Sequence, residues 1–279
     1  MRAFSRRQNK LKTQMRSTTS VAIVTGAVGG MGAPSARRLA ADGWPLLLCD
    51  LDPGQIEQIA EPLRKAGANV DTLAGDVGEP AFPGQLLAAL GKRSIGAVIH
   101  TAGLSPTLAD AARIWSVNYV ATERLVAAVL PRMVEGSCAV LISSSSAYMV
   151  RSAEVDAAIA KLMTGDASAI EPMLTTPQAA YPLSKRAVIA LVAGQSSRFG
   201  ERKARIVSIS PGLIDTGMGR AELAASPQAK LMLARIPLRR LGLGDEVASL
   251  VAFLCSPQAS YVSGCDIKVD GGMLAALGF

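Results

Sequence analysis

The chain has 279 residues, of which 49% are hydrophobic and 18% are charged. This balance is typical of a globular protein and excludes an intrinsically disordered one. The net charge of +7 is concentrated before residue 20, where six basic residues occur without any acidic residue: Arg2, Arg6, Arg7, Lys10, Lys12 and Arg16. The rest of the chain is close to neutral, which argues against a nucleic-acid-binding face.

The basic segment 1–19 contains no apolar run, so we expect it to be neither a secretory signal nor a membrane span. We expect a disordered extension, and a weak targeting or anion-binding segment is the alternative. Elsewhere no uninterrupted apolar run reaches the roughly 18 residues that a membrane-spanning helix needs.

The cysteines and the histidine bear on redox compartment and metal binding. Four cysteines occur without CxxC spacing: Cys49, Cys138, Cys255 and Cys265. They are expected to be buried thiols in a reducing, cytoplasmic compartment. Because His100 is the one histidine, no metal site is expected.

From residue 20 onward, short apolar runs alternate with segments of helical period. The expected strands are 21–24, 45–49, 70–73, 95–99, 139–142 and 204–209. The expected helices are 35–41, 55–65, 111–134 and 185–199. Apolar strands separated by helices predict a parallel sheet that is covered on both faces. Since no linker interrupts the pattern, residues 20–279 are expected to form one domain.

A glycine-rich turn, Thr25-Gly26-Ala27-Val28-Gly29-Gly30-Met31-Gly32, follows the first expected strand. Glycines in this turn allow a tight bend and a close approach of the backbone to a pyrophosphate, and the N-terminus of the next helix attracts the anion. The spacing is Gly-x3-Gly-x-Gly and not the commoner GxGxxG, so the strand–turn–helix context carries the interpretation. We expect the turn to bind a dinucleotide through Gly26, Val28, Gly29, Gly30, Met31 and Gly32.

Small or acidic residues end the next three expected strands. Asp50 is placed to accept hydrogen bonds from the adenosine ribose and to repel a 2′-phosphate, which predicts NAD as the cofactor, with Leu51 in the same site. Asp76-Val77 is expected to hold the adenine, unless Asp76 is only a turn residue. Thr101-Ala102-Gly103 has side chains small enough to let a dinucleotide pass near the backbone.

Two segments, 147–178 and 212–242, depart from the alternation. The first contains helix-like pieces at 154–163 and 167–174, and the second contains one at 221–234. Both follow strands whose carboxyl ends border the ligand crevice of an open parallel sheet. We interpret them as walls or lids of a substrate pocket, with ordinary surface insertions as the alternative. Their apolar members suggest an apolar ligand or internal packing of a lid: Leu162, Met163, Met173, Leu174, Met218, Leu231 and Met232.

Tyr181 and Lys185 form the most informative pair in the chain. Residues four apart on a helix lie on one face, so the phenol and the ammonium can point into one site. A nearby ammonium favours the phenolate and lowers the pKa of the phenol. This arrangement suits a proton transfer to or from an alcohol oxygen.

Together these motifs resemble those of the short-chain dehydrogenase/reductase family, over residues 20–275. The residues that carry the resemblance are Thr25-Gly26-x3-Gly30-x-Gly32, Asp76, Ala102-Gly103, Asn118, Ser143–Ser146, Tyr181-x3-Lys185, Pro211-Gly212 with Thr216, and Asp270-Gly271-Gly272. The resemblance implies an α/β fold: a single Rossmann-type, doubly wound domain with a seven-stranded parallel sheet and helices on both faces. It also implies an NAD-dependent oxidoreductase that acts on a small-molecule alcohol or ketone and forms a homodimer or homotetramer.

The resemblance assigns four catalytic residues. Tyr181 would be the general acid/base, and Lys185 would lower its pKa and hold the nicotinamide ribose. Asn118 would complete a proton relay through water. Ser144 would hydrogen-bond the substrate oxygen, with Ser145 as the alternative because four serines are consecutive.

The segment after the sixth expected strand matches the family's nicotinamide-binding segment. Its residues Pro211, Gly212, Ile214 and Thr216 are expected to contact the cofactor. The carboxamide would meet the backbone of Ile214 and the hydroxyl of Thr216.

The sequence also departs from the family pattern. Where the family usually has Asn-Asn-Ala-Gly, this chain has His100-Thr101-Ala102-Gly103, and His100 is expected to be a packing residue. The spacer between the serine run and Tyr181 is unusually long. Followed by Ala180-Tyr181, it resembles the bacterial 3-alpha-hydroxysteroid dehydrogenase/carbonyl reductase subgroup, which implies bulky, apolar substrates.

Two other functions stay open. A 3-oxoacyl-thioester reductase would prefer NADPH, a short spacer and basic residues near its pocket, where Arg235, Arg239 and Arg240 form a cluster. A non-catalytic NAD-binding sensor is also compatible with the fold, although it would not need Ser144, Asn118, Tyr181 and Lys185 together.

Overall fold

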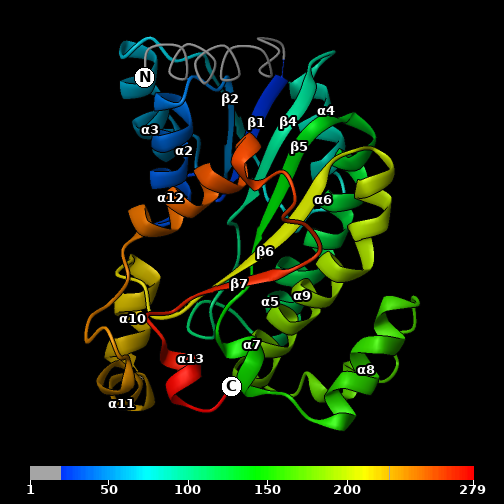
Figure 1. The fold of residues 1–279 in the computed structure, drawn as a ribbon, viewed down its shortest axis with the longest axis vertical. Helices are drawn as coiled ribbons and strands as arrows, with labels where there is room; N and C mark the ends of the chain where they lie inside the picture. Colours follow the sequence, from blue (N-terminus) through cyan, green and yellow to red (C-terminus); the bar gives the residue numbers. More distant parts are fainter. Residues whose placement is uncertain (1–19, 226) are drawn as a thin grey trace, which may run out of the picture.

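Seven parallel strands form one sheet in the order β3-β2-β1-β4-β5-β6-β7 (Figure 1). The computed structural model describes residues 20–225 and 227–279, so the expected disordered extension at 1–19 lies outside the described residues. The strands are β1 (Ser20–Thr25), β2 (Leu46–Asp50), β3 (Val70–Ala74), β4 (Ser94–His100), β5 (Met133–Ile142), β6 (Arg205–Pro211) and β7 (Asp266–Val269). The predicted single domain with a seven-stranded, doubly wound parallel sheet is confirmed.

Helices cover both faces of the sheet. On one face lie α2 (Gly32–Ala41), α3 (Pro53–Lys65) and α12 (Gly244–Leu254). On the other lie α4 (Phe82–Leu90), α5 (Ala111–Trp115), α6 (Ala121–Val129) and α9 (Pro177–Glu201). Successive strand residues point to opposite faces, so Ala22 and Val24 pack under the first group while Val21 and Ile23 pack under the second. This alternation explains why the strands are apolar throughout.

The strand order reverses direction between β1 and β4, which is where an open α/β sheet forms its ligand crevice. Short elements gather beyond the carboxyl ends of the strands, at the lower end of Figure 1. They are α7 (Ser146–Met149), α10 (Gly217–Ala225), α11 (Pro227–Arg235) and α13 (Met273–Ala276). The remaining elements are α8 (Ala153–Met163) and the 3-10 turns η3 (Glu171–Met173) and η4 (Pro257–Ala259).

Three predicted helix boundaries are wrong. The helix expected over 111–134 is α5, a π-helical turn η1 (Ser116–Val120), α6 and a 3-10 turn η2 (Leu130–Arg132). It stops there because Pro131 has no N–H to continue the helix, and β5 begins at Met133. The helix expected over 167–174 is reduced to η3. Helix α9 begins at Pro177 and not at Lys185, and the Thr176 hydroxyl caps it by accepting from the Ala179 N–H at 3.2 Å.

Helix α8 packs against the outer side of α9, on the opposite side of Figure 1 from α10 and α11. Arg186 of α9 donates to Asp156 of α8 at 2.7 Å. The apolar residues Ala158, Ile159 and Leu162 are buried in the same cluster as α9. The α8 part of the insertion is therefore held as part of the core.

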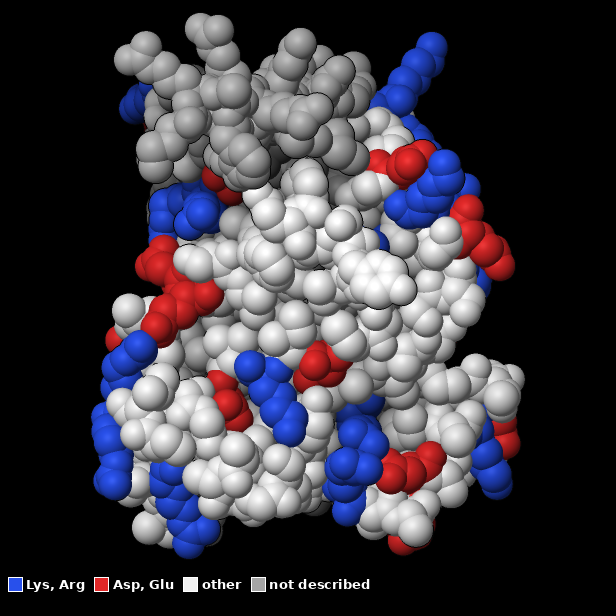
Figure 2. All heavy atoms as spheres, in the orientation of Figure 1, with Lys and Arg blue, Asp and Glu red and all other residues white. Residues whose placement is uncertain are grey.

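Charge is mixed over the visible surface. On the face shown in Figure 2, lysine and arginine side chains are interspersed with aspartate and glutamate around an uncharged centre. Over residues 20–225 and 227–279, no helix is both long and apolar enough to cross a bilayer.

Candidate active site

Helix α9 carries Tyr181 and Lys185 one turn apart, as predicted. The Lys185 Nζ lies 5.8 Å from the centroid of the Tyr181 ring. It donates a hydrogen bond to the Ile142 carbonyl at 3.0 Å, and the Lys185 backbone carbonyl accepts from the Ser143 hydroxyl at 2.8 Å. Ile142 therefore holds the side chain of Lys185, and Ser143 holds its backbone.

Lys185 is only 5% exposed. Burial disfavours the charged form and lowers the pKa of its ammonium to about 8. Below that pH the ammonium keeps its charge next to the Tyr181 ring. A buried cation with a strongly lowered pKa beside a phenol ring is therefore a candidate functional group.

The serine run follows β5 and divides into two kinds of residue. Ser143 and Ser145 are buried, and the Ser145 N–H donates to the Pro211 carbonyl at 2.8 Å. Ser144 and Ser146 are half-buried. The Ser144 Oγ accepts from both the N–H and the hydroxyl of Ser146, at 3.1 and 3.0 Å. The spacing of the run alone could not distinguish these environments.

Asn118 lies in the π-helical turn η1 and is 1% exposed. Its amide exchanges two hydrogen bonds with the backbone of Leu104, at 2.8 and 2.9 Å. It also donates to the Ser184 hydroxyl at 3.2 Å, which in turn donates to the Tyr181 carbonyl at 2.7 Å. Asn118 is thereby tied to the helical turn that bears Tyr181, and π-turns of this kind are frequent at functional sites.

His100 is completely enclosed at the end of β4. One ring nitrogen lies 2.7 Å from the Thr25 hydroxyl and the other lies 2.8 Å from the Thr122 hydroxyl. The Thr122 hydroxyl donates to the Asn118 carbonyl at 2.8 Å, so Nε2 of His100 carries the proton and Nδ1 accepts from Thr25. Burial, and then the positive charge of Lys185, lower the pKa of His100 to about 3, so the ring is neutral.

The glycine turn approaches its neighbours too closely for side chains. Gly26 has a φ of +67°, and a β-carbon there would lie 2.6 Å from the Ala102 nitrogen. A β-carbon at Gly32 would collide with the Gly26 carbonyl, and one at Gly30 would collide with the Thr216 side chain. The predicted residues Ala102 and Thr216 therefore border the turn.

The start of α2 fits an anionic group. Gly29 and Gly30 are exposed at the mouth of the turn. The N-cap residue Met31 makes no side-chain capping bond, and the first turn of α2 contains no acidic residue. A ten-residue helix with these features presents its positive end to the crevice, which is the chemistry that a dinucleotide pyrophosphate requires.

Asp50 reaches back to the glycine turn. Its carboxylate accepts from the Val28 N–H at 2.9 Å and from the Leu51 N–H at 2.8 Å. Leu51 is exposed beside it. The half-buried carboxylate keeps lone pairs for ribose hydroxyls, and its negative charge disfavours a 2′-phosphate.

Asp76 has a partner that the sequence pattern did not predict. It accepts from the Gly78 N–H at 2.7 Å and forms an ion pair with Arg113 of α5. Asp76 and Arg113 are 37 residues apart, and no local pattern signals such a pair. Val77 is partly buried against the core.

Gly103, which follows β4, lies between two of the catalytic candidates, Asn118 and Lys185. A β-carbon on Gly103 would be 3.1 Å from the Asn118 Oδ1 and 3.2 Å from the Lys185 Nζ. The neighbouring Thr101 hydroxyl donates to the Thr25 carbonyl at 2.8 Å. The backbone after β4 therefore leaves little room for a side chain between Asn118 and Lys185.

Pro211 to Thr216 leads from β6 into α10 and α11. The backbone of Gly212 crosses the chain at Asp270, where a β-carbon would lie 2.8 Å from the Asp270 Cα. Ile214 pairs with Gly242 as an isolated parallel bridge, so the excursion 215–241 is closed at its base.

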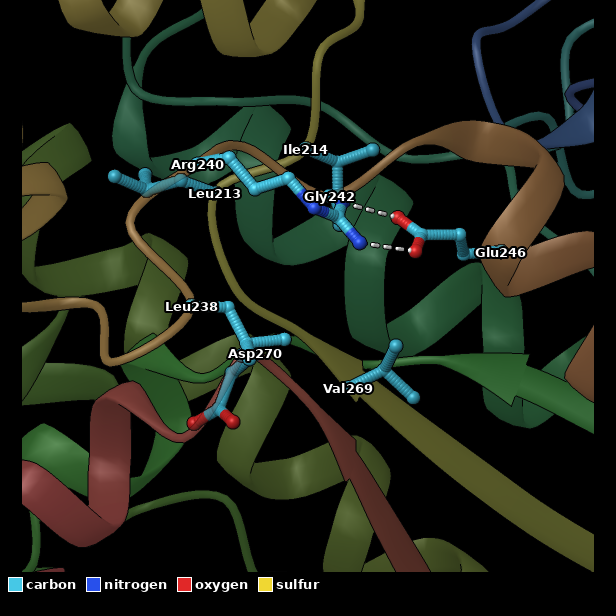
Figure 3. A pocket seen from close by; sticks show the side chains of 9 residues that line it. Leu213, Ile214, Leu238, Arg240, Gly242, Glu246, Val269 and Asp270 are labelled. Atoms are coloured by element: carbon cyan, nitrogen blue, oxygen red, sulfur yellow. Dashed lines mark hydrogen bonds and ion pairs between the residues drawn. The ribbon is translucent and has the colours of Figure 1, made fainter.

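The Arg240 guanidinium binds Glu246 with two hydrogen bonds, at 2.6 and 2.8 Å, beside this bridge (Figure 3). A hollow of about 100 Å³ lies between these residues and β7. None of Ser144, Tyr181 and Lys185 lines it, so this hollow is not the catalytic crevice.

A doubly wound sheet, a glycine turn at its switch point and a Tyr–Lys pair on a helix define a Rossmann-type oxidoreductase. The family described as short chain dehydrogenase matches residues 20–157, and one described as enoyl-(acyl carrier protein) reductase matches residues 166–274. The short-chain dehydrogenase/reductase bsc3 of Alternaria brassicicola is 31% identical over 92% of this chain and 97% of its own length. The chain therefore belongs to the short-chain dehydrogenase/reductase family, whose members use a nicotinamide cofactor.

Solved structures agree with the fold. A short-chain dehydrogenase/reductase, described as glucose/ribitol dehydrogenase, from Brucella melitensis is 27% identical. It has a TM-score of 0.75 and covers 91% of this chain and 96% of its own. A short chain dehydrogenase from Burkholderia cenocepacia J2315, solved in complex with NADP, is 23% identical and has a TM-score of 0.74, with 92% and 98% covered. At that identity the second likeness concerns the fold alone.

Proposed function

We propose that this protein is an NAD(H)-dependent dehydrogenase of secondary alcohols, or a reductase of the corresponding ketones, with a bulky and apolar substrate. The observation that carries the proposal is the buried Lys185 ammonium beside the Tyr181 ring, held by the Ile142 carbonyl. Burial of the Lys185 ammonium at this place is explained if the ammonium stabilises the phenolate form of Tyr181.

The proposed chemistry in the oxidative direction uses three side chains. A nicotinamide cofactor held by the glycine turn would supply the acceptor for the hydride of the alcohol carbon. Tyr181, as phenolate, accepts the hydroxyl proton, and Lys185 stabilises the phenolate electrostatically. Ser144 donates a hydrogen bond to the reacting oxygen, a contribution worth about 3 kcal/mol for one well-placed donor.

We assign the cofactor site to the residues that border the glycine turn. The turn itself and the N-terminus of α2 would hold the pyrophosphate, Asp50 the ribose, and Asp76 the adenine. Thr101 to Gly103 and Pro211 to Thr216 would border the nicotinamide half. NAD is supported by Asp50 and by the uncharged side chain of Val28.

The substrate proposal rests on the excursion 215–241. Leu231 of α11 is 67% exposed, so the surface of this excursion offers apolar contact. In the first insertion Leu162 is buried in the core, and three partly buried residues pack against the core: Met163, Met173 and Leu174. We therefore assign specificity for a hydroxysteroid-like or other alicyclic alcohol to the second insertion.

A dimer or tetramer is part of the same proposal. Phe253 on α12 is 44% exposed, and Tyr261 after η4 is fully exposed. Large apolar side chains of this kind suit a subunit contact. Sedimentation velocity measures the assembly directly, and a monomer at micromolar concentration would contradict it.

The first experiment measures initial rates with NAD and with NADP on secondary alcohols, from short aliphatic ones to 3-hydroxysteroids. Turnover with NAD on bulky alicyclic alcohols supports the proposal. Reduction of a 3-oxoacyl thioester with NADPH would instead favour the thioester reductase. Of the basic cluster expected for that function, Arg240 is already paired with Glu246.

The catalytic assignment is tested with Tyr181→Phe, which keeps the ring and removes the proton acceptor. We expect turnover to fall by about two orders of magnitude or more, with NAD affinity retained. Tyr119→Phe, which removes a phenol hydroxyl that donates to Glu123 at 3.2 Å, is the matched control. Wild-type turnover in Tyr181→Phe would refute the assignment. A wild-type chain that binds NAD and turns over no alcohol of the panel would instead favour a non-catalytic sensor.

A further inference from the structure

We propose that Ser146 is a positioning residue that fixes the Ser144 hydroxyl as a hydrogen-bond donor toward the substrate oxygen. This inference rests on the proposed function, because it assigns a role to Ser144 in alcohol oxidation. It adds a residue that acts through Ser144 without touching the substrate.

The geometry at Ser144 carries the inference. A serine hydroxyl has one proton to donate and two lone pairs that accept. The Ser144 Oγ accepts from the Ser146 N–H at 3.1 Å and from the Ser146 hydroxyl at 3.0 Å. Both acceptor positions are filled from one side, so the only remaining capacity of Ser144 is its proton.

The elements around Ser146 hold it in place. The Tyr148 hydroxyl of α7 donates to Asp266 of β7 at 2.7 Å, and the other oxygen of Asp266 accepts from the Ser208 hydroxyl at 2.6 Å. The Lys268 ammonium lies 4.3 Å from the centroid of the Tyr148 ring. Helix α7 is therefore anchored to β6 and β7 through Tyr148, four residues after Ser144.

The anchor explains why a four-residue helix can orient a side chain. The Ser145 N–H binds the Pro211 carbonyl at 2.8 Å, which fixes the backbone between Ser144 and Ser146. Since the backbone on both sides of Ser146 is fixed, the Ser146 hydroxyl is held in the orientation that bonds Ser144. This is the preorganised donor geometry that stabilises charge developing on an oxygen.

Loss of the Ser146 hydroxyl should misdirect Ser144 without removing it. In Ser146→Ala one lone pair of Ser144 is open, and its O–H can rotate away from the substrate. The Ser146 N–H remains, so the effect should be moderate. We expect kcat to fall about fivefold, in keeping with the loss of one hydrogen bond of about 1 kcal/mol, while the Kd for NAD stays unchanged.

The experiment is a double-mutant cycle on the full chain, with the best alcohol from the substrate panel. Rates are measured for Ser144→Ala, Ser146→Ala and the double variant, together with Kd for NAD. If Ser146 acts through Ser144, the double variant is no slower than Ser144→Ala. Ser146→Thr keeps a hydroxyl and should recover most of the rate, and Ser249→Ala, at an exposed position of α12, is the control.

The outcomes separate the two proposals. Additive losses in the double variant, or an unchanged kcat in Ser146→Ala, would overturn the role of Ser146. Wild-type rates in Ser144→Ala would instead refute the proposed function of Ser144. A large loss in Ser145→Ala with Ser144→Ala active would transfer the catalytic role to Ser145 and overturn both.

Discussion

The Lys185 Nζ lies 3.0 Å from the backbone carbonyl oxygen of Ile142. This bond joins helix α9 to the carboxyl end of β5, and it places the ammonium of Lys185 in the protein interior. A dipolar partner compensates only part of the desolvation of an ammonium. Lys185 should therefore reduce the stability of the fold in which it functions.

The pH dependence of stability tests this cost. The pKa of Lys185 is lowered from 10.5 to about 8 in the folded chain, so between these values the unfolded chain binds more protons and stability rises with pH. At pH 7 we expect Lys185→Met to be more stable than the wild type by about 1 to 3 kcal/mol, and the difference to shrink by pH 10.5.

Urea unfolding at pH 7 and pH 10.5 measures the difference. Lys203→Met is the matched control, because Lys203 is exposed and forms a surface ion pair with Glu135. A Lys185→Met variant that is equally destabilised at both values of pH would show that the buried charge carries no cost.

The neutral state of His100 can be observed directly, because the chain has one histidine. Its pKa is lowered from 6.5 to about 3, first by burial. The imidazole C2–H signal in a proton NMR spectrum should therefore stay unchanged from pH 8 down to pH 5. Titration with a midpoint near pH 6.5 would contradict the buried network with Thr25 and Thr122.

The same shift contributes to acid unfolding. Between pH 6.5 and pH 3 the unfolded chain binds a proton that the folded chain excludes, so the stability present above pH 6.5 is lost progressively as the pH falls. His100→Asn should show a weaker pH dependence over this range. An identical dependence in both proteins would assign the acid transition to other groups.

Cofactor preference is expected to depend on Asp50. Asp50→Ala removes the carboxylate proposed to hold the ribose, and we expect the Kd for NAD to rise about 10-fold or more, since a hydrogen bond to a charged group contributes about 1.5 to 3 kcal/mol. The preference over NADP should decrease as well. Calorimetric titration with both nucleotides measures the two values.

Asp52→Ala provides the matched control. Asp52 caps α3 by accepting from Gly54 and Gln55, at 2.8 and 3.1 Å. Its loss should lower the free energy of unfolding by about 1 kcal/mol and leave both nucleotide affinities unchanged. A wild-type protein that binds NADP as tightly as NAD would refute the interpretation of Asp50.

The two insertions should respond differently to truncation of a leucine. Leu162 on α8 is buried, whereas Leu231 on α11 is exposed. Leu162→Ala should lower the free energy of unfolding by about 2 to 4 kcal/mol with little change in KM. Leu231→Ala should raise KM for an apolar substrate and leave stability unchanged.

Chemical denaturation and steady-state kinetics on the same two variants measure both effects. A Leu162→Ala variant with normal stability and a raised KM would restore the interpretation of the first insertion as a pocket wall. Unchanged KM in Leu231→Ala would place the substrate elsewhere than on α11.

The sequence by itself determined the features that depend on near neighbours. Apolar runs alternating with helical segments predicted the parallel sheet, because strand and helix periods are local properties of the chain. Gly26, Gly30 and Gly32 predicted the turn after β1, and the four-residue spacing placed Tyr181 and Lys185 on one helix face. These predictions needed only backbone geometry within a few residues.

Only the tertiary structure decided what those residues contact. The Ile142 carbonyl meets Lys185 across 43 residues, and Arg113 meets Asp76 across 37. The helix limits at Val129 and Pro177 and the packing of α8 against α9 likewise arose from the assembled chain. Hydrogen bonds and burial of this kind depend on how the strands and helices pack together. The residue pattern of one segment cannot predict them, because their partners lie in distant segments.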